Sequence, residues 1–359
     1  MPTSQNVHLE LATFLQNTGI RLSMVARLFD DALAMPDDQD VEKVRIFIPD
    51  LHVISKSRQV VYPGYGFHAN PQREEIMVNL LRAIGSFARQ LPRVTMLEIY
   101  QLGDFVDLWR ESFSNDPSEI IADNAPVCDL LLRGLRTSPT DSPIPIYCLR
   151  GNHDFTIMDW SYFSSWQRAY FFDDNSMAVL HGDVLDWVEA WPDWPRRAIV
   201  YLTGVRSGET NFSQKELEKG TNAIHQTNET AGRYAWTNEY WLGKQLPPIP
   251  ESPTGPVDEN VIKADDFSGH ELMANACELA DQLLSTRQIR TRLMIIGHTH
   301  HPRIVRYQKD NELFVLMDCG AWLENYWVGP DPDTKPSVTF HSQQIGVVIG
   351  NDLRIYQVD

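Results

Sequence analysis

Cysteine is scarce in this chain. Its 359 residues include four cysteines, Cys128, Cys148, Cys277 and Cys319. None of them forms a Cys-x-x-Cys pair, so the sequence excludes zinc fingers and thioredoxin-type redox motifs. Because four cysteines in so long a chain are not a disulfide framework, we expect free thiols and a reducing compartment.

Basic residues and long apolar runs are also few. The chain has 31 Lys and Arg against 48 Asp and Glu, which gives a formal net charge of −17. This charge repels nucleic acids, so general nucleic-acid binding is not expected. No apolar run approaches the roughly 20 residues of a membrane span, and the first residues do not read as a secretory signal. We therefore expect a cytoplasmic location, peripheral to the membrane if the substrate is a lipid.

Short apolar runs alternate with helical patterns, which predicts an α/β fold. An N-terminal helical extension is expected over residues 1–40, with a helix from His8 to Met35 that is either continuous or broken in two at Gly19. The helix is expected from the helical spacing of Leu22, Val25, Phe29 and Leu33. The main domain is expected over residues 41–359. Further helices are predicted over 72–91 and over 119–135, the latter either kinked or divided at Pro126. Strands are predicted over 44–48, 94–102, 144–149, 177–180, 293–296, 313–317, 345–349 and 353–357.

The alternation of strands and helices is interrupted over residues 184–290. This stretch is rich in Trp and polar residues, and it ends in a helix with a capping box at Ser268 and Glu271. We interpret it as a helical and loop insertion, which is either a lid or a partner surface. Arg196 and Arg197 within it are candidate substrate-binding residues.

Five short polar clusters each follow a predicted strand, where α/β sheets place their ligand sites. Their carboxylates, imidazoles and amide are ligands for divalent metals. Seven ligands are too many for one tetrahedral zinc ion, and they match two metals that share a bridging carboxylate. The clusters are Asp50-Leu51-His52, Gly103-Asp104-Phe105-Val106-Asp107, Gly151-Asn152-His153-Asp154, His181-Gly182-Asp183 and Gly297-His298-Thr299-His300.

The spacing within the clusters supports a common site. Asp50 and His52 are two residues apart, so on an extended strand end they point the same way, and His298 and His300 share this relation. A glycine precedes Asp104, as it does Asn152 and His298, and it permits a sharp turn after the strand.

In this order, the clusters resemble the calcineurin-like metallophosphoesterases, whose pattern is DxH, GDxxD, GNH(D/E), H and GHxH. The resemblance implies a two-sheet β-sandwich flanked by helices. It also implies two divalent metals (Mn, Fe or Zn), with Asp104 as the bridging ligand, His153 as proton donor and Asp107 orienting His153. The implied ligands are Asp50, His52, Asp104 and His300 for one metal, and Asp104, Asn152, His181 and His298 for the other.

The resemblance also implies a reaction. Two metals lower the pKa of a bridging water from about 15.7 toward about 7, and the resulting hydroxide attacks phosphorus. A phosphodiester or pyrophosphate bond is the expected target. Trp109 after the second cluster, Phe155 after the third and Pro302 after His301 are similar to the UDP-2,3-diacylglucosamine hydrolases. A UDP-linked lipid or nucleotide is thus one expected substrate, with His301 a candidate contact.

Two alternatives remain open. One is a phosphomonoesterase that acts on nucleotides or phosphoproteins. The other is a non-catalytic scaffold on the same fold, although no expected ligand is missing. The segment Cys319-Gly320-Ala321-Trp322 is similar to the family's late motif, usually Asn-x-Gly-Ser, from which Asp318 and Ala321 differ.

Overall fold

A computed structural model describes most of the chain outside the predicted insertion. The described residues are 4–29, 42–61, 67, 72–91, 95–108, 117–136, 140–154, 166–167, 169–172, 176–185, 276–277, 279–281, 283–285, 288, 290–300, 302–309, 312–322, 325–327, 337–340 and 343–359.

A six-stranded mixed sheet forms the first layer. Its strand order is β1-β13-β12-β2-β3-β4, and β2, β3 and β4 run parallel to one another. Alternation along β2 explains how the sheet is buried on both faces. Val44, Ile46 and Ile48 face one core, while Phe47 faces another. The strands are β1 (Leu22–Phe29), β2 (Glu42–Ile48), β3 (Thr95–Gln101), β4 (Ile146–Cys148), β12 (Gln344–Ile349) and β13 (Asp352–Val358).

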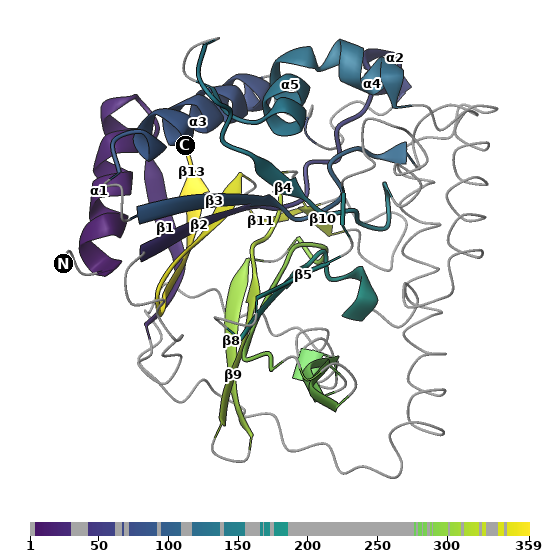
Figure 1. The fold of residues 1–359 in the computed structure, drawn as a ribbon. Coiled ribbons are helices and arrows are strands. Elements are labelled where there is room, and N and C mark those ends of the chain that lie inside the picture. Colours follow the sequence, from purple (N-terminus) through teal and green to yellow (C-terminus); the bar gives the residue numbers. More distant parts are fainter. Residues whose placement is uncertain are drawn as a thin grey trace, which may run out of the picture.

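Helices cover the outer face of this sheet (Figure 1). The longest, α3 (Arg73–Ala88), buries Met77, Leu80, Leu81 and Ile84, whose spacing places them on one side of a helix. The acidic residues of its first turn, Glu74 and Glu75, interact favourably with the positive end of the helix dipole. The other helices are α1 (Ser4–Asn17), α2 (Lys56–Val61), α4 (Ser118–Asp123) and α5 (Ala125–Arg133).

A five-stranded sheet forms the second layer, in the order β5-β6-β7-β9-β8. Apolar side chains of both sheets, among them Tyr100, Ile295 and Met317, form one core cluster. The other face of the second sheet packs against Ala276, Leu279 and Ala280. The strands are β5 (Ala169–Phe172), β6 (Met177–Leu180), β7 (Leu293–Ile296), β8 (Arg303–Lys309) and β9 (Glu312–Asp318). The described residues also form a 3₁₀ turn (Asp183–Leu185) and a two-stranded antiparallel sheet of β10 (Asn325–Trp327) and β11 (Ser337–Phe340).

The predicted α/β fold, with two sheets and flanking helices, is confirmed. Helix α4 ends at Asp123 and α5 begins at Ala125, with Pro126 in its first turn, so the helix is divided, which is one of the two predicted outcomes. The eight predicted strands all appear, with bounds that differ by a few residues at most.

The predicted N-terminal helix is wrong in its second half. The helix ends at Asn17, and Leu22–Phe29 form strand β1, which pairs antiparallel with β13. Gly19 adopts φ +89°, a conformation that ends a helix at little cost for glycine. Pairing with β13 then outweighs the helical spacing of the apolar residues, because sheet partners distant in sequence override local pattern.

Parts of the predicted insertion can be compared with the structure. The described residues between 276 and 285 are helical, as expected, whereas Ser268 and Glu271 of the capping box lie outside the described residues. The two predicted roles of the insertion, a lid or a partner surface, concern residues outside the described part of the chain, so both stay predictions. Among the helices that the structure describes, none has the length and apolar character that crossing a bilayer requires.

Candidate metal and catalytic site

The five polar clusters lie at the carboxyl ends of β2, β3, β4, β6 and β7. Main-chain bonds join the loops to one another. The N–H of His52 donates to the carbonyl of Asp104 at 2.9 Å, and the N–H of Gly297 donates to the carbonyl of His181 at 2.9 Å. Because β2, β3 and β4 are parallel, as are β6 and β7, each sheet delivers its loops to one edge.

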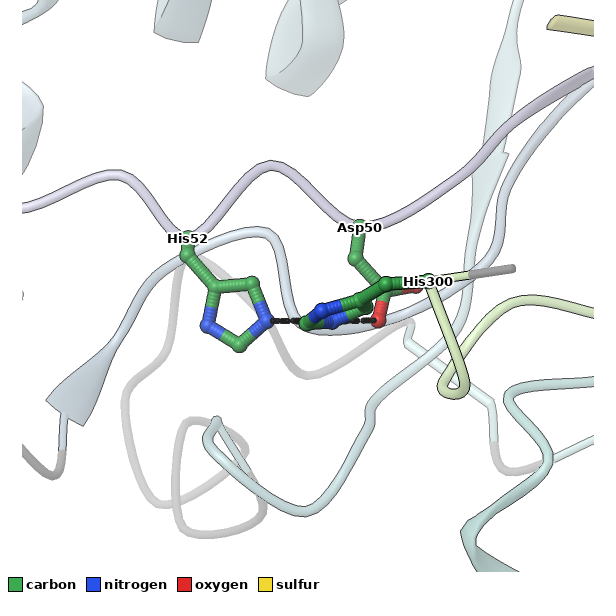
Figure 2. A group of neighbouring side chains, drawn as sticks. All are labelled: Asp50, His52 and His300. Carbon is green, nitrogen blue, oxygen red and sulfur yellow. Dashed lines mark hydrogen bonds and ion pairs between the residues drawn. The ribbon is translucent and has the colours of Figure 1, made fainter. Parts of the chain in front are cut away.

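Asp50, His52 and His300 form the first group of candidate ligands (Figure 2). Nε2 of His300 lies 3.1 Å from Oδ2 of Asp50 and 3.2 Å from Nε2 of His52. Two ligand atoms that bind one ion at about 2.1 Å lie roughly 3.0–3.4 Å apart at octahedral or tetrahedral angles. The observed spacings therefore fit a shared divalent cation.

Asp104, Asn152 and His181 form a second group. Nε2 of His181 lies 3.0 Å from Oδ1 of Asn152 and 3.3 Å from Oδ2 of Asp104. The same Asp104 oxygen lies 3.5 Å from Nε2 of His52 in the first group. Asp104 thus lies between the two groups, in the place that a bridging ligand requires.

The ring orientations of two histidines suit metal binding. Nδ1 of His181 lies 2.9 Å from the carbonyl oxygen of Leu102, and Nδ1 of His52 lies 3.2 Å from Oδ2 of Asp107. A bond of this kind places the hydrogen on Nδ1 and presents the lone pair of Nε2 to a metal. In both residues Nε2 is the atom that faces the other candidate ligands.

His298 is placed beside the second group. Its ring lies near that of His181, with centroids 5.0 Å apart, and its main-chain N–H donates to both oxygens of Asp50 at 3.1 Å. In the described part of the chain, some groups of three acidic or histidine side chains have ligand atoms within 4.8 Å of one another. His298 does not belong to any of these groups.

The electrostatics of the site favour a cation. Burial raises the pKa of Asp104, but the nearby histidines His181, His153 and His52 lower it by more than burial raises it. The pKa of Asp104 therefore lies well below its ordinary value. Burial lowers the pKa of His181, yet Asp104 and Asp50 raise it well above the ordinary value. The carboxylates that favour a proton on His181 equally favour a metal ion in its place.

His153 and Asp107 form a second pair beside the ligands. Nδ1 of His153 lies 3.1 Å from Oδ1 of Asp107, whose carboxylate is fully buried. The His153 side chain is 13% exposed, and its main-chain N–H donates to Oδ1 of Asp104 at 2.8 Å. His153 is therefore held next to the ligand groups with its ring oriented by a carboxylate.

Asp154 joins the loops that carry Asp104 and Asn152. Its two carboxylate oxygens accept the N–H groups of Gly151 at 2.7 Å and of Phe105 at 2.9 Å. Burial, and then the charge of Asp104, raise the pKa of Asp154 to about 8, although both N–H bonds oppose the shift. Asp154 thus acts as a clamp that holds the loop of Gly151 to the loop of Phe105. The sequence places Asp154 at the end of the third cluster, but this role is seen only once the two loops lie side by side.

Glycine at two positions allows carboxylates to approach the main chain. A Cβ atom at Gly151 would collide with Oδ1 of Asp104, and one at Gly297 would collide with Oδ1 of Asp50. Glycine at these two positions therefore lets the carboxylates lie against the main chain. This is a second reason for glycine here, beside the sharp turn that the sequence predicts.

The structure thus brings together nine of the predicted site residues. The three predicted substrate-binding residues, Arg196, Arg197 and His301, lie outside the described residues, as does Trp109.

Comparison with known proteins identifies the family. The model of the calcineurin-like phosphoesterase family matches residues 46–302, which include all five clusters. The chain belongs to this family and is a metal-dependent hydrolase. A search among curated proteins finds no match to the chain.

Proposed function

We propose that the chain hydrolyses a phosphodiester or pyrophosphate bond with two divalent metal ions. Two ligand groups joined at one oxygen of Asp104 are the observation that carries this proposal. The first metal is assigned to Asp50, His52, Asp104 and His300, and the second to Asp104, Asn152, His181 and His298. Mn, Fe and Zn all suit carboxylate and imidazole ligands.

When bound, such ions lower the pKa of water and neutralise charge on the phosphoryl oxygens. The residues of the chain supply the rest. His153 donates a proton from Nε2 to the leaving oxygen. In a diester this prevents the departure of an unstable alkoxide, and in a pyrophosphate it lowers the negative charge on the phosphate that leaves. Asp107 keeps the hydrogen of His153 on Nδ1 and stabilises the cationic imidazole before the proton is transferred.

The choice of bond rests on sequence resemblance. Phe155 and Pro302, in the segments after the third and fifth clusters, are similar to the UDP-2,3-diacylglucosamine hydrolases, which favours a pyrophosphate in a nucleotide-linked lipid. We assign substrate selection to the 184–290 insertion in the main domain, with contacts from Arg196 and Arg197, and to His301. Guanidinium groups bind phosphate oxygens in pairs, so these arginines suit a phosphate tail.

The test is hydrolysis by Mn-loaded protein of bis-p-nitrophenyl phosphate and of p-nitrophenyl phosphate, each with and without chelator. We expect metal-dependent cleavage of the diester well above that of the monoester. Faster cleavage of the monoester would replace the proposal with a phosphomonoesterase. If two metals bind and neither ester is cleaved, UDP-linked lipids and nucleotides are tested next. If the protein does not hydrolyse these either, the proposal fails and the non-catalytic scaffold is favoured.

A further inference from the structure

A buried carboxylate lies behind the loop that carries His298 and His300. Asp318 ends β9, and in the pairing of β7 with β9 it lies opposite Ile296, the last residue before that loop. Its side chain is fully buried, and Oδ2 accepts the hydroxyl hydrogen of Thr299. Thr299 is the residue between the two histidines.

The loop needs such an anchor because its backbone is unfavourable. His298 and His300 both adopt left-handed conformations, with φ of 71° and 61°. Side chains other than glycine rarely adopt this region unless surrounding contacts impose it. The Thr299 hydroxyl, held at Asp318, fixes the centre of the loop between these two residues.

The same carboxylate reaches two further segments. Oδ1 accepts the N–H of Gly320 at 3.2 Å, which precedes Ala321, the residue that pairs with Asp50. Nη2 of Arg303 lies 3.8 Å from Oδ2, and Arg303 is the cross-strand partner of Asp318 in β8. Asp318 thus connects the loop of His298 and His300 with the segment that holds Asp50.

We propose that Asp318 is a positioning residue for the metal centre, which fixes His298 and His300 through the hydroxyl of Thr299. The inference rests on the proposed metal-binding function. Residues that orient metal ligands without touching the metal commonly contribute 10- to 100-fold to its affinity. Two residues form this arrangement. Thr299 lies between the two histidines, and the buried Asp318 lies on the neighbouring strand β9.

The experiment is calorimetric titration of metal-free protein with Mn²⁺. Thr299→Val removes the hydroxyl at nearly constant volume, and we expect the dissociation constant to rise about 10- to 100-fold. Asp318→Asn keeps one acceptor oxygen for the Thr299 hydroxyl but loses the second acceptor and the charge, so it should give a smaller rise. The double variant should add little to Thr299→Val, because both act through one contact. Thr299→Ser, which keeps the hydroxyl, should restore the wild-type affinity.

Asp352→Asn is the matched control. Asp352 is also a fully buried side chain that binds arginines, Arg27 and Arg354. It begins β13 and pairs with Ile349 of β12, which in turn pairs with Val44 near the start of β2, whereas Asp50 follows the end of β2. This variant should keep the wild-type metal affinity even where its melting temperature falls.

The outcomes separate the two proposals. Wild-type affinity in folded Thr299→Val would overturn the inference while leaving the proposed function intact. An equal loss of affinity in Asp352→Asn would also overturn it, since the effect would then be one of general stability. If the wild-type chain binds no metal, the proposed function fails and the inference fails with it. Should Asp318→Asn not fold, the comparison of Thr299→Val with Thr299→Ser decides alone.

Discussion

The carboxylate of Asp107 contacts Nδ1 of His153 at 3.1 Å through Oδ1. Its other oxygen, Oδ2, lies 3.2 Å from Nδ1 of His52. One buried side chain therefore orients both the predicted proton donor and a predicted metal ligand. The two histidine rings lie edge to face, with centroids 4.6 Å apart. Under the proposed function, Asp107 therefore serves both the proton donor and a metal ligand, and replacing His153 or Asp107 should have different effects.

Replacing His153 with alanine should reduce catalysis and leave metal binding largely intact. The variant loses the proton donor, which typically costs about a hundredfold to ten-thousandfold in kcat. Steady-state kinetics and metal analysis of the same preparation measure both quantities. An equal loss of metal and turnover would show that His153 is a ligand rather than a proton donor.

Asp107→Asn should affect both properties, because it disturbs His52 as well as His153. We expect kcat to fall as in His153→Ala and metal affinity to weaken about 10- to 100-fold. Titration of the metal-free variant beside His153→Ala separates the two effects. Unchanged metal affinity in Asp107→Asn would mean that the contact with His52 contributes nothing to the site.

Asp154→Asn should destabilise the fold near the site. The asparagine amide offers one acceptor oxygen where the carboxylate offers two, so either Gly151 or Phe105 loses the acceptor of a buried N–H. Such a loss costs about 1–3 kcal/mol. Urea denaturation of the metal-free variant and wild type measures the difference, and identical midpoints and slopes would argue against the clamp.

His8 gives a pH dependence that is remote from the site. Burial, followed by the charge of Arg354, lowers the pKa of His8 to about 4, while Asp352 opposes the shift. Its ring lies 3.3 Å from the carbonyl oxygen of Asp352 and 3.4 Å from the hydroxyl of Tyr356, and Arg27 also faces this cluster. The folded state thus holds His8 neutral, at a pKa below the 6.5 of the unfolded chain.

As the pH falls from 6.5 toward 4, the unfolded chain binds a proton on His8 and the folded chain does not. Stability should therefore fall over this window, by at most about 3 kcal/mol relative to His8→Gln. Free energies of unfolding at pH 7, 6, 5 and 4 for both proteins isolate this contribution. Parallel curves for wild type and variant would contradict it.

The site could be predicted from the sequence in large part because its ligands follow strands in short, spaced clusters. Residue type and order identify Asp50, His52, Asp104, Asn152, His181 and His300 as one constellation. The roles of Asp154 and Asp318 could not be predicted, because each depends on N–H or hydroxyl groups from loops distant in sequence. The dual contact of Asp107 depends on the same three-dimensional arrangement.

The fold shows the same division. Helix α3 and the buried strands follow from apolar spacing alone. Strand β1 does not, since Leu22, Val25 and Phe29 fit a helix locally and become a strand only through pairing with β13. The sequence likewise gives no sign of β5 and β8, which flank the second sheet and take their form from their neighbours.

We propose that a single carboxylate oxygen, Oδ2 of Asp104, joins the two metal sites. The most direct test is metal content per chain, by inductively coupled plasma mass spectrometry, in wild type and Asp104→Ala after loading with Mn²⁺ and removal of excess ion. The account predicts two ions per chain in the wild type and the loss of both in the variant. Full retention of either ion in folded Asp104→Ala would contradict it.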